Sequence, residues 1–117
     1  MQSAFQPRPG DLDRKLDVLF PDPVTREQAR MALAGYGDEA WHREPERVRL
    51  AILYLARGDL DDVKRRVEAA SVDYRDVIAA AEYPLLMGLP PDVDPESDTY
   101  RQALSSDEKR YRAWVDG

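Results

Sequence analysis

Apolar residues recur at helical spacing along most of the chain, and short segments rich in proline, glycine and aspartate separate these stretches. Spacings of three and four place the apolar side chains on one face of an amphipathic helix. No stretch of useful length alternates apolar and polar residues as a strand requires. Residues 1–10 are polar, contain two prolines and are expected to form a flexible tail. The pattern therefore predicts an all-α, single-domain bundle of five or six short helices over residues 11–117.

Capping residues, proline and glycine divide the first 70 residues into four expected helices. They run between Asp11 and Pro21, over 25–34 with Thr25 as the cap, over 46–57 and over 59–70. The third has the widest apolar stripe, so its hairpin with the fourth is expected at the centre of the bundle. Trp41, in the loop before this hairpin, is expected to fold back onto the bundle.

Prolines interrupt the last third of the chain. Ser71 or Asp73 can begin a helix that runs through Glu82, and Pro84 disfavours its continuation. An acidic and proline-containing linker, PPDVDPESD, comes later, and one or two helices are expected over 95–116.

Residues 83–91, YPLLMGLPP, combine three prolines and a glycine with four apolar side chains. The prolines argue against a regular helix, so a loop is expected. Its apolar side chains either plug one end of the bundle or dock another protein, because a contiguous apolar patch on a small protein usually marks an interface. Both interpretations hold if only some of these side chains point inward. The candidate partner-binding residues are Leu85, Leu86, Met87 and Leu89.

The charge and the missing cysteine limit the partners and the chemistry. The 117 residues include 17 Lys and Arg against 23 Asp and Glu, a net charge of -6. This charge disfavours binding to nucleic acid or to an anionic membrane and favours a basic protein partner. The absence of cysteine excludes thiolate nucleophiles and disulfides. No signal-peptide core or membrane-spanning run is present, so a cytoplasmic location is expected.

Several polar groups have the residue types of a functional site, but each has a simpler structural explanation. Asp73 and Asp76 share one side of a helix and, with Glu82, are the candidates for a divalent-cation site. Helix capping is the preferred interpretation for Asp73 and for Asp59, and Asp76 is interpreted as a favourable charge at the positive end of the helix dipole. His42 has no second histidine to complete a metal site, so a packing or hydrogen-bonding role is expected. We therefore expect no metal, no other cofactor and no enzymatic activity.

Two basic runs, KRR at 64–66 and KRYR at 109–112, are flanked by acidic residues. They are interpreted as solvated helix faces with intrahelical ion pairs rather than as nucleic-acid sites. The sequence also lacks a nucleophile elbow, a phosphate-binding loop and a dinucleotide fingerprint.

The segment from Arg47 to Pro84 reads RVRLAILYLARGDLDDVKRRVEAASVDYRDVIAAAEYP. It resembles a family of small bacterial helical proteins with the pattern R-V-x-L-A-I-L-x-L-x-x-G-D-L, then D-Y-R-D-V and A-E-Y-P. The likeness covers about a third of the chain. It implies a bacterial source and an all-helical domain, and it transfers no site residue because the family has no assigned activity.

Three functions are compatible with these features. The first is a non-catalytic protein-interaction or regulatory module that presents the 84–93 loop and an acidic surface to a protein partner. The second is a small acidic inhibitor or immunity-type protein that neutralises a basic enzyme by charge complementarity. The third, and the least favoured, is a carboxylate-metal enzyme that uses Asp73, Asp76 and Glu82.

Overall fold

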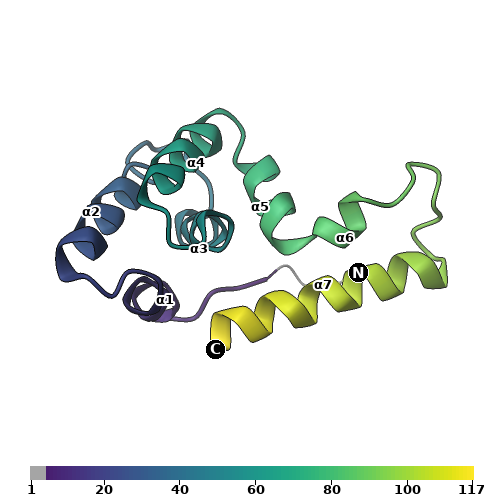
Figure 1. The fold of residues 1–117 in the computed structure, drawn as a ribbon. Helices are drawn as coiled ribbons and strands as arrows, with labels where there is room; N and C mark the ends of the chain where they lie inside the picture. The colour runs from purple at the N-terminus through teal and green to yellow at the C-terminus, as the bar shows by residue number, and fades with distance from the viewer. Residues whose placement is uncertain (1–4) are drawn as a thin grey trace.

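The computed structural model describes residues 5–117, and within that range the chain forms seven helices and no strand (Figure 1). The helices are α1 (Asp11–Leu19), α2 (Pro23–Ala34), α3 (Pro45–Ala56), α4 (Leu60–Val72), α5 (Tyr74–Glu82), α6 (Pro84–Met87) and α7 (Asp98–Asp116). The expected all-α fold is confirmed. The expected number of five or six helices is too low, because the segment expected as a loop over 84–91 begins with a helical turn, α6.

Helix α3 occupies the centre of the core. It contacts α1, α4 and α5, which surround it in Figure 1. Its buried residues are Val48, Leu50, Ala51, Ile52, Leu53 and Ala56. The expected hairpin of α3 and α4 is present, but α4 buries only Val63 and Ala70 fully, so the centre is α3 alone. Pro45 stands in the first turn of α3, where its missing N–H costs no hydrogen bond.

Aspartate caps set the starts of three helices. Asp22 accepts a hydrogen bond from the backbone N–H of Thr25 at 2.9 Å and is the cap of α2. The helix therefore begins at Pro23, two residues before Thr25, which was the expected cap. Asp59 and Asp73 cap α4 and α5 in the same way, as the sequence predicts. Each carboxylate pairs an N–H group that the first turn leaves without an intrahelical acceptor.

His42 organises the loop between α2 and α3. Its Nδ1 accepts hydrogen bonds from the backbone N–H groups of Gly37 at 2.7 Å and Glu39 at 3.3 Å. Its ring stacks on Tyr36, with 4.4 Å between ring centroids. Trp41 touches the edge of His42 but is 59% exposed, so the expectation that it folds back onto the bundle is wrong. Tyr36 fills the buried position beneath this loop instead.

Replacing His42 with alanine should lower the free energy of unfolding by about 1–2 kcal/mol, because two backbone N–H groups lose their shared acceptor. Urea denaturation of the variant beside the wild type measures the change. A Trp41→Ala variant keeps the acceptor and should lose less. Equal losses in the two variants would show that ring packing, and not the hydrogen bonds, holds the loop.

The segment before α1 lies against the other end of the chain. Of the tail expected over residues 1–10, residues 1–4 lie outside the described residues. Phe5 packs edge-on against Tyr111 of α7, with 5.0 Å between ring centroids, and Arg8 forms an ion pair with Asp116. Phe5 therefore contributes to the aromatic contacts of α7.

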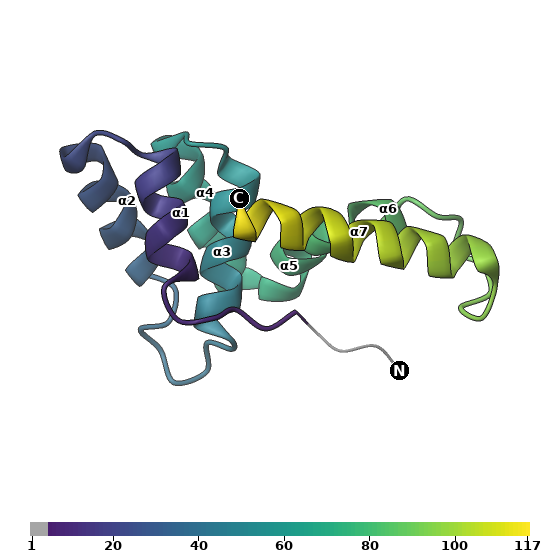
Figure 2. The same ribbon diagram turned by 90° about the horizontal axis from the view of Figure 1, so that it is seen from below.

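Helix α7 is one continuous helix of 19 residues that begins after the cap Ser97. Its C-terminal half joins the core through Tyr111 and Val115, which are both buried. Its N-terminal half runs beside α6 and projects beyond α1 to α4, as both views show (Figure 1 and Figure 2). The molecule is accordingly elongated, with extents of 47 × 30 × 23 Å. We call residues 83–106 the arm.

Candidate functional site

Asp107 of α7 holds α6 in place. Its side chain is fully buried, and its two oxygens accept hydrogen bonds from the backbone N–H groups of Leu85 at 3.2 Å and Leu86 at 3.0 Å. The carboxylate is thus a cap supplied to α6 by another helix. Arg110 lies 3.5 Å from Asp107 and provides the opposite charge. Together with Pro84 in the first helical turn, this contact explains why a proline-rich segment forms a helix.

The four candidate contact residues divide into two pairs by their exposure. Leu85 and Met87 are 53% and 58% exposed, and we call them the exposed pair. Leu86 and Leu89 are half-buried, in the part of the chain where α6 contacts α5 and α7. The segment therefore places some of its apolar side chains inward and offers the others to solvent.

The arm contains no fully buried side chain. Along the chain, the buried residues of the hydrophobic core run as far as Ala81, and the next one is Tyr111. Full burial of each large apolar side chain would contribute about 1.5–3 kcal/mol to the stability of the fold. Because the side chains of the arm are only partly buried or exposed, they contribute less than this. Its large apolar residues are Tyr83, Leu85, Leu86, Met87, Leu89, Val93, Tyr100 and Leu104.

The arm is acidic as far as Arg101. Between Arg75 and Arg101 the sequence contains six acidic residues and no Lys or Arg. They are Asp76, Glu82, Asp92, Asp94, Glu96 and Asp98, and all except Glu82 are exposed. Exposed carboxylates around an apolar surface favour the approach of a basic partner.

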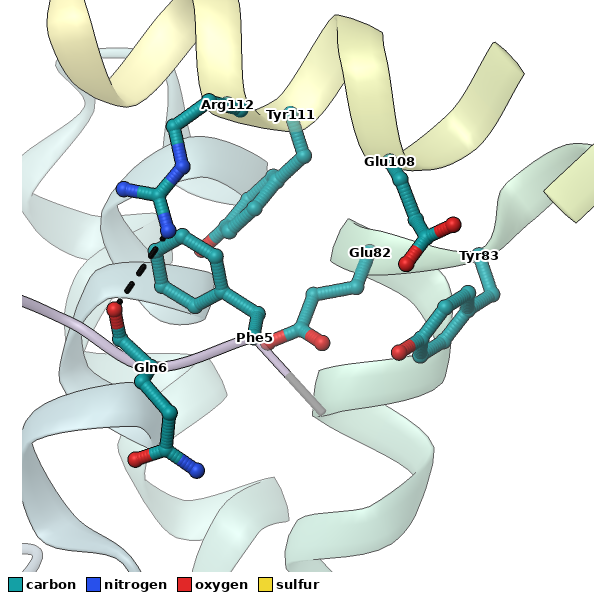
Figure 3. Close-up of a pocket in the computed structure, with 7 residues that line it drawn as sticks. All are labelled: Phe5, Gln6, Glu82, Tyr83, Glu108, Tyr111 and Arg112. Atoms are coloured by element: carbon teal, nitrogen blue, oxygen red, sulfur yellow. Dashed lines mark hydrogen bonds between the residues drawn. The ribbon is translucent and has the colours of Figure 1, made fainter. Parts of the chain in front are cut away.

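A cavity of about 400 Å³ lies at the base of the arm (Figure 3). It is open to solvent on one side and is bordered by the end of α5, the middle of α7 and the segment before α1. Phe5, Tyr83 and Tyr111 give it aromatic walls, and Glu82 and Glu108 give it two carboxylates. Figure 3 shows the Glu82 and Glu108 side chains directed toward the same space from α5 and α7.

Glu82 is a buried carboxylate with a strong partner. Arg47 Nε lies 2.9 Å from Glu82 Oε2, and Arg47 Nη2 lies 2.7 Å from Oε1, a two-point ion pair between α3 and α5. Burial raises the pKa of Glu82, and the hydrogen bonds and charge of Arg47 oppose this rise. The same hydrogen bonds raise the pKa of Arg47, so the guanidinium stays charged. The second partner of Arg47 is the exposed Glu44, at 3.1 Å.

Tyr111 lines the cavity, and its hydroxyl group has no partner within the described part of the chain. Its side chain is 1% exposed, and its hydroxyl oxygen is buried and has no hydrogen-bond partner among residues 5–117. Burial raises the pKa of the phenol, and the nearby Glu82 charge adds to this rise, so the hydroxyl keeps its proton. A buried hydroxyl usually has a partner, so this one is available to a water molecule or to a ligand.

Arg112 closes one side of the cavity. Its guanidinium carbon lies 4.3 Å from the centroid of the Phe5 ring, a cation–π contact. Arg112 Nη2 lies 3.4 Å from the backbone oxygen of Gln6. Arg112 Nη1 lies 3.9 Å from Asp116 Oδ1, and among residues 5–117 it is buried without a hydrogen-bond partner. These amino groups therefore face the segment before α1 and the end of α7, not the two carboxylates of the cavity.

The structure does not bring the three candidate metal-binding carboxylates together. Asp73 precedes α5 and Glu82 ends it, so the length of the helix, about 13 Å at 1.5 Å per residue, separates them. Asp73 bonds to Arg75, and Glu82 bonds to Arg47, whereas Asp76 is exposed. Among the residues that the structure describes, no group of three or more His, Asp or Glu side chains is placed to hold a metal ion.

The two basic runs have different surroundings. In the first, Arg65 and Arg66 both pair with Asp62, and Arg66 Nε lies 2.7 Å from Asp62 Oδ2, as expected for an intrahelical ion-pair network. In the second, Arg110 donates to the hydroxyl of Tyr54 and so links α7 to α3. The second run is therefore partly a packing element.

Comparison of the chain with protein-family models, curated proteins and solved structures finds no match. The resemblance to small bacterial helical proteins thus assigns neither a family nor an activity. Across residues 5–117, no helix combines the length and the apolar character needed to cross a membrane.

Sequence reasoning missed Asp107, the residue that positions α6. Its partners, such as Leu85, are more than twenty residues away in the chain, so no local spacing connects them. One signal was available. Leu104, Tyr111 and Val115 form an apolar stripe at helical spacing, and Asp107 lies within it. An acidic residue inside an apolar stripe is expected to have a buried partner.

Proposed function

We propose that the protein is a non-catalytic, cytoplasmic protein-interaction module that binds its partner through the arm. The observation that supports this best is that the arm has no fully buried side chain, although it carries eight large apolar residues. Asp107 holds the exposed pair, Leu85 and Met87, on a fixed helical turn. Fixed apolar groups lose little conformational entropy on binding, which favours their use as a docking surface.

The charge around the arm supports a basic partner. Residues 76–100 contain no Lys or Arg, so the matching surface is an apolar groove bordered by basic side chains. A second copy of this chain is a poor occupant, because it would place two acidic loops opposite each other. We therefore propose a different, basic protein as the partner.

The acidic border also supports a second function, an inhibitor that neutralises a basic enzyme by charge complementarity. The dependence of binding on ionic strength distinguishes the two functions. An electrostatic inhibitor loses association rate steeply as ionic strength rises, whereas a complex held by the exposed pair keeps its lifetime.

Affinity capture from the source organism tests the proposal with two variants of equal charge. The Leu85→Asp, Met87→Asp variant changes the exposed pair. The matched control, Val24→Asp, Val72→Asp, changes two exposed valines on α2 and α4. We expect the wild type and the control to capture the same basic protein, and we expect the arm variant to lose it while circular dichroism and melting show it folded.

Amide hydrogen exchange on the captured complex locates the interface. Protection concentrated in residues 83–106 would support the proposal. Protection elsewhere, or unchanged capture by the folded arm variant, would reject the arm as the docking surface.

A further inference from the structure

We propose that the cavity at the base of the arm binds an alkylammonium group, carried either by a lysine side chain or by a free alkylamine. The cavity holds about 400 Å³, and a liquid water occupies about 30 Å³, so an amine with a short alkyl chain fits. This inference does not depend on the proposed function of the arm, because a free amine needs no protein partner.

Three acceptor groups line the cavity. Glu108 is exposed and makes no ion pair with the rest of the described chain, and each oxygen of Glu82 keeps a lone pair beyond its bond to Arg47. The Tyr111 hydroxyl oxygen, buried and without a partner among residues 5–117, is the third acceptor. An ammonium carries three N–H donors, so it can bond to more than one acceptor of this lining.

The aromatic walls favour the same charge. A cation over a ring face is attracted by the π electrons, and the ring of Phe5 already accepts the guanidinium of Arg112 in this way. Tyr83 and Tyr111 add two more rings to the lining. The alkyl part of the ligand would cover these rings and exclude water from the contact.

Other ligand classes fit the cavity less well. An anion would meet the carboxylates of Glu82 and Glu108. A hard divalent cation needs about six oxygen ligands, and the walls are mainly aromatic. A guanidinium is best bound by a carboxylate that accepts two parallel hydrogen bonds, and because Arg47 already occupies that side of Glu82, only Glu108 could bind it in this way. The ammonium, with single donors in three directions, is the remaining class.

NMR titration of the isotopically labelled full chain tests the site directly. The probes are butylamine, as its ammonium ion, and Nα-acetyl-lysine N-methylamide. We expect saturable shifts at the amides of Tyr83, Glu108 and Tyr111, with a dissociation constant of about 1 mM. The probe that binds more tightly shows whether the natural ligand is a lysine side chain of a protein or a free amine. The norleucine analogue, which lacks the amino group, should not bind.

Two variants connect binding to the named groups. Glu108→Gln should weaken binding by about fivefold, because it removes the free carboxylate. Glu96→Gln makes the same charge change in the arm loop and should leave affinity unchanged. Tyr111→Phe should weaken binding by about threefold without lowering the melting temperature, because the hydroxyl has no hydrogen bond to lose.

Three results would overturn the site. They are an absence of saturable shifts, equal binding of the norleucine analogue, and equal weakening by Glu96→Gln and Glu108→Gln. The Leu85→Asp, Met87→Asp variant should bind butylamine at least as well as the wild type. Loss of partner capture and loss of amine binding therefore report on separate proposals.

Discussion

Replacing Arg47 with methionine should lower the free energy of unfolding by about 3–5 kcal/mol, the range seen when one partner of a buried ion pair is removed. Glu82 would lose hydrogen bonds at both of its oxygens and remain buried between α3 and α5. Native proteins are stable by only about 5–15 kcal/mol, so this single change removes a large part of the total. Urea denaturation of both proteins measures the loss.

The loss should depend on pH. Burial raises the pKa of Glu82, and removal of Arg47 takes away the group that opposes the rise. A carboxyl whose pKa is higher in the folded state takes up a proton on folding. Stability is then retained below the ordinary glutamate pKa of about 4.3 and falls as pH rises through the folded value. The deficit of Arg47→Met should therefore be larger at about pH 7 than at about pH 4.

Two further variants identify Glu82 as the cause. Adding Glu82→Gln to Arg47→Met removes the uncompensated charge and should recover part of the stability at about pH 7. Glu44→Gln removes only the exposed partner of Arg47 and should change stability by about 0.5 kcal/mol or less. A deficit of equal size at both pH values would mean that water reaches the Glu82 carboxylate after the substitution.

Local signals in the sequence were sufficient for most of the helices. The third helix was expected over 46–57 and runs over Pro45–Ala56, because its apolar stripe and its first-turn proline act within a few residues. Asp73 was expected as a cap and is one. Capping bonds join residues two or three apart, so residue type and spacing alone can locate them.

Contacts between distant residues could not be read from spacing. The helical turn α6 depends on Asp107, which lies on α7. Glu82 was considered for a metal site with Asp73, but its partner is Arg47, 35 residues earlier in the chain. Trp41 was expected to cover the bundle, yet Tyr36 takes the buried position. In each case tertiary packing decides which of several suitable side chains is used.

The candidate site was predicted in part. Composition alone identified the apolar segment after Tyr83, but exposure of Leu85 and Met87 depends on how α6 packs against α5 and α7. The cavity could not be predicted at all, because its walls come from three separate segments that include Phe5. Its strongest indication, the unpartnered hydroxyl of Tyr111, is a property of packing and not of sequence.

Replacing Asp107 with alanine should release the arm from the body. The N–H groups of Leu85 and Leu86 would lose a charged acceptor, and Arg110 would lose its opposite charge, at a cost of about 3 kcal/mol. Amide hydrogen exchange should accelerate in residues 84–106, while the amides of α3 keep their protection, because the core does not include the arm.

Asp107→Asn is the matched control, because its amide oxygen can still accept one of the two hydrogen bonds, and an intermediate effect is expected. Ser105→Ala, at an exposed position of the same helix, should change neither exchange nor stability. Unchanged exchange in the arm of Asp107→Ala would show that packing alone fixes α6. If the arm is released, capture of the basic partner should weaken although Leu85 and Met87 are intact, because an unfixed turn must be ordered again on binding.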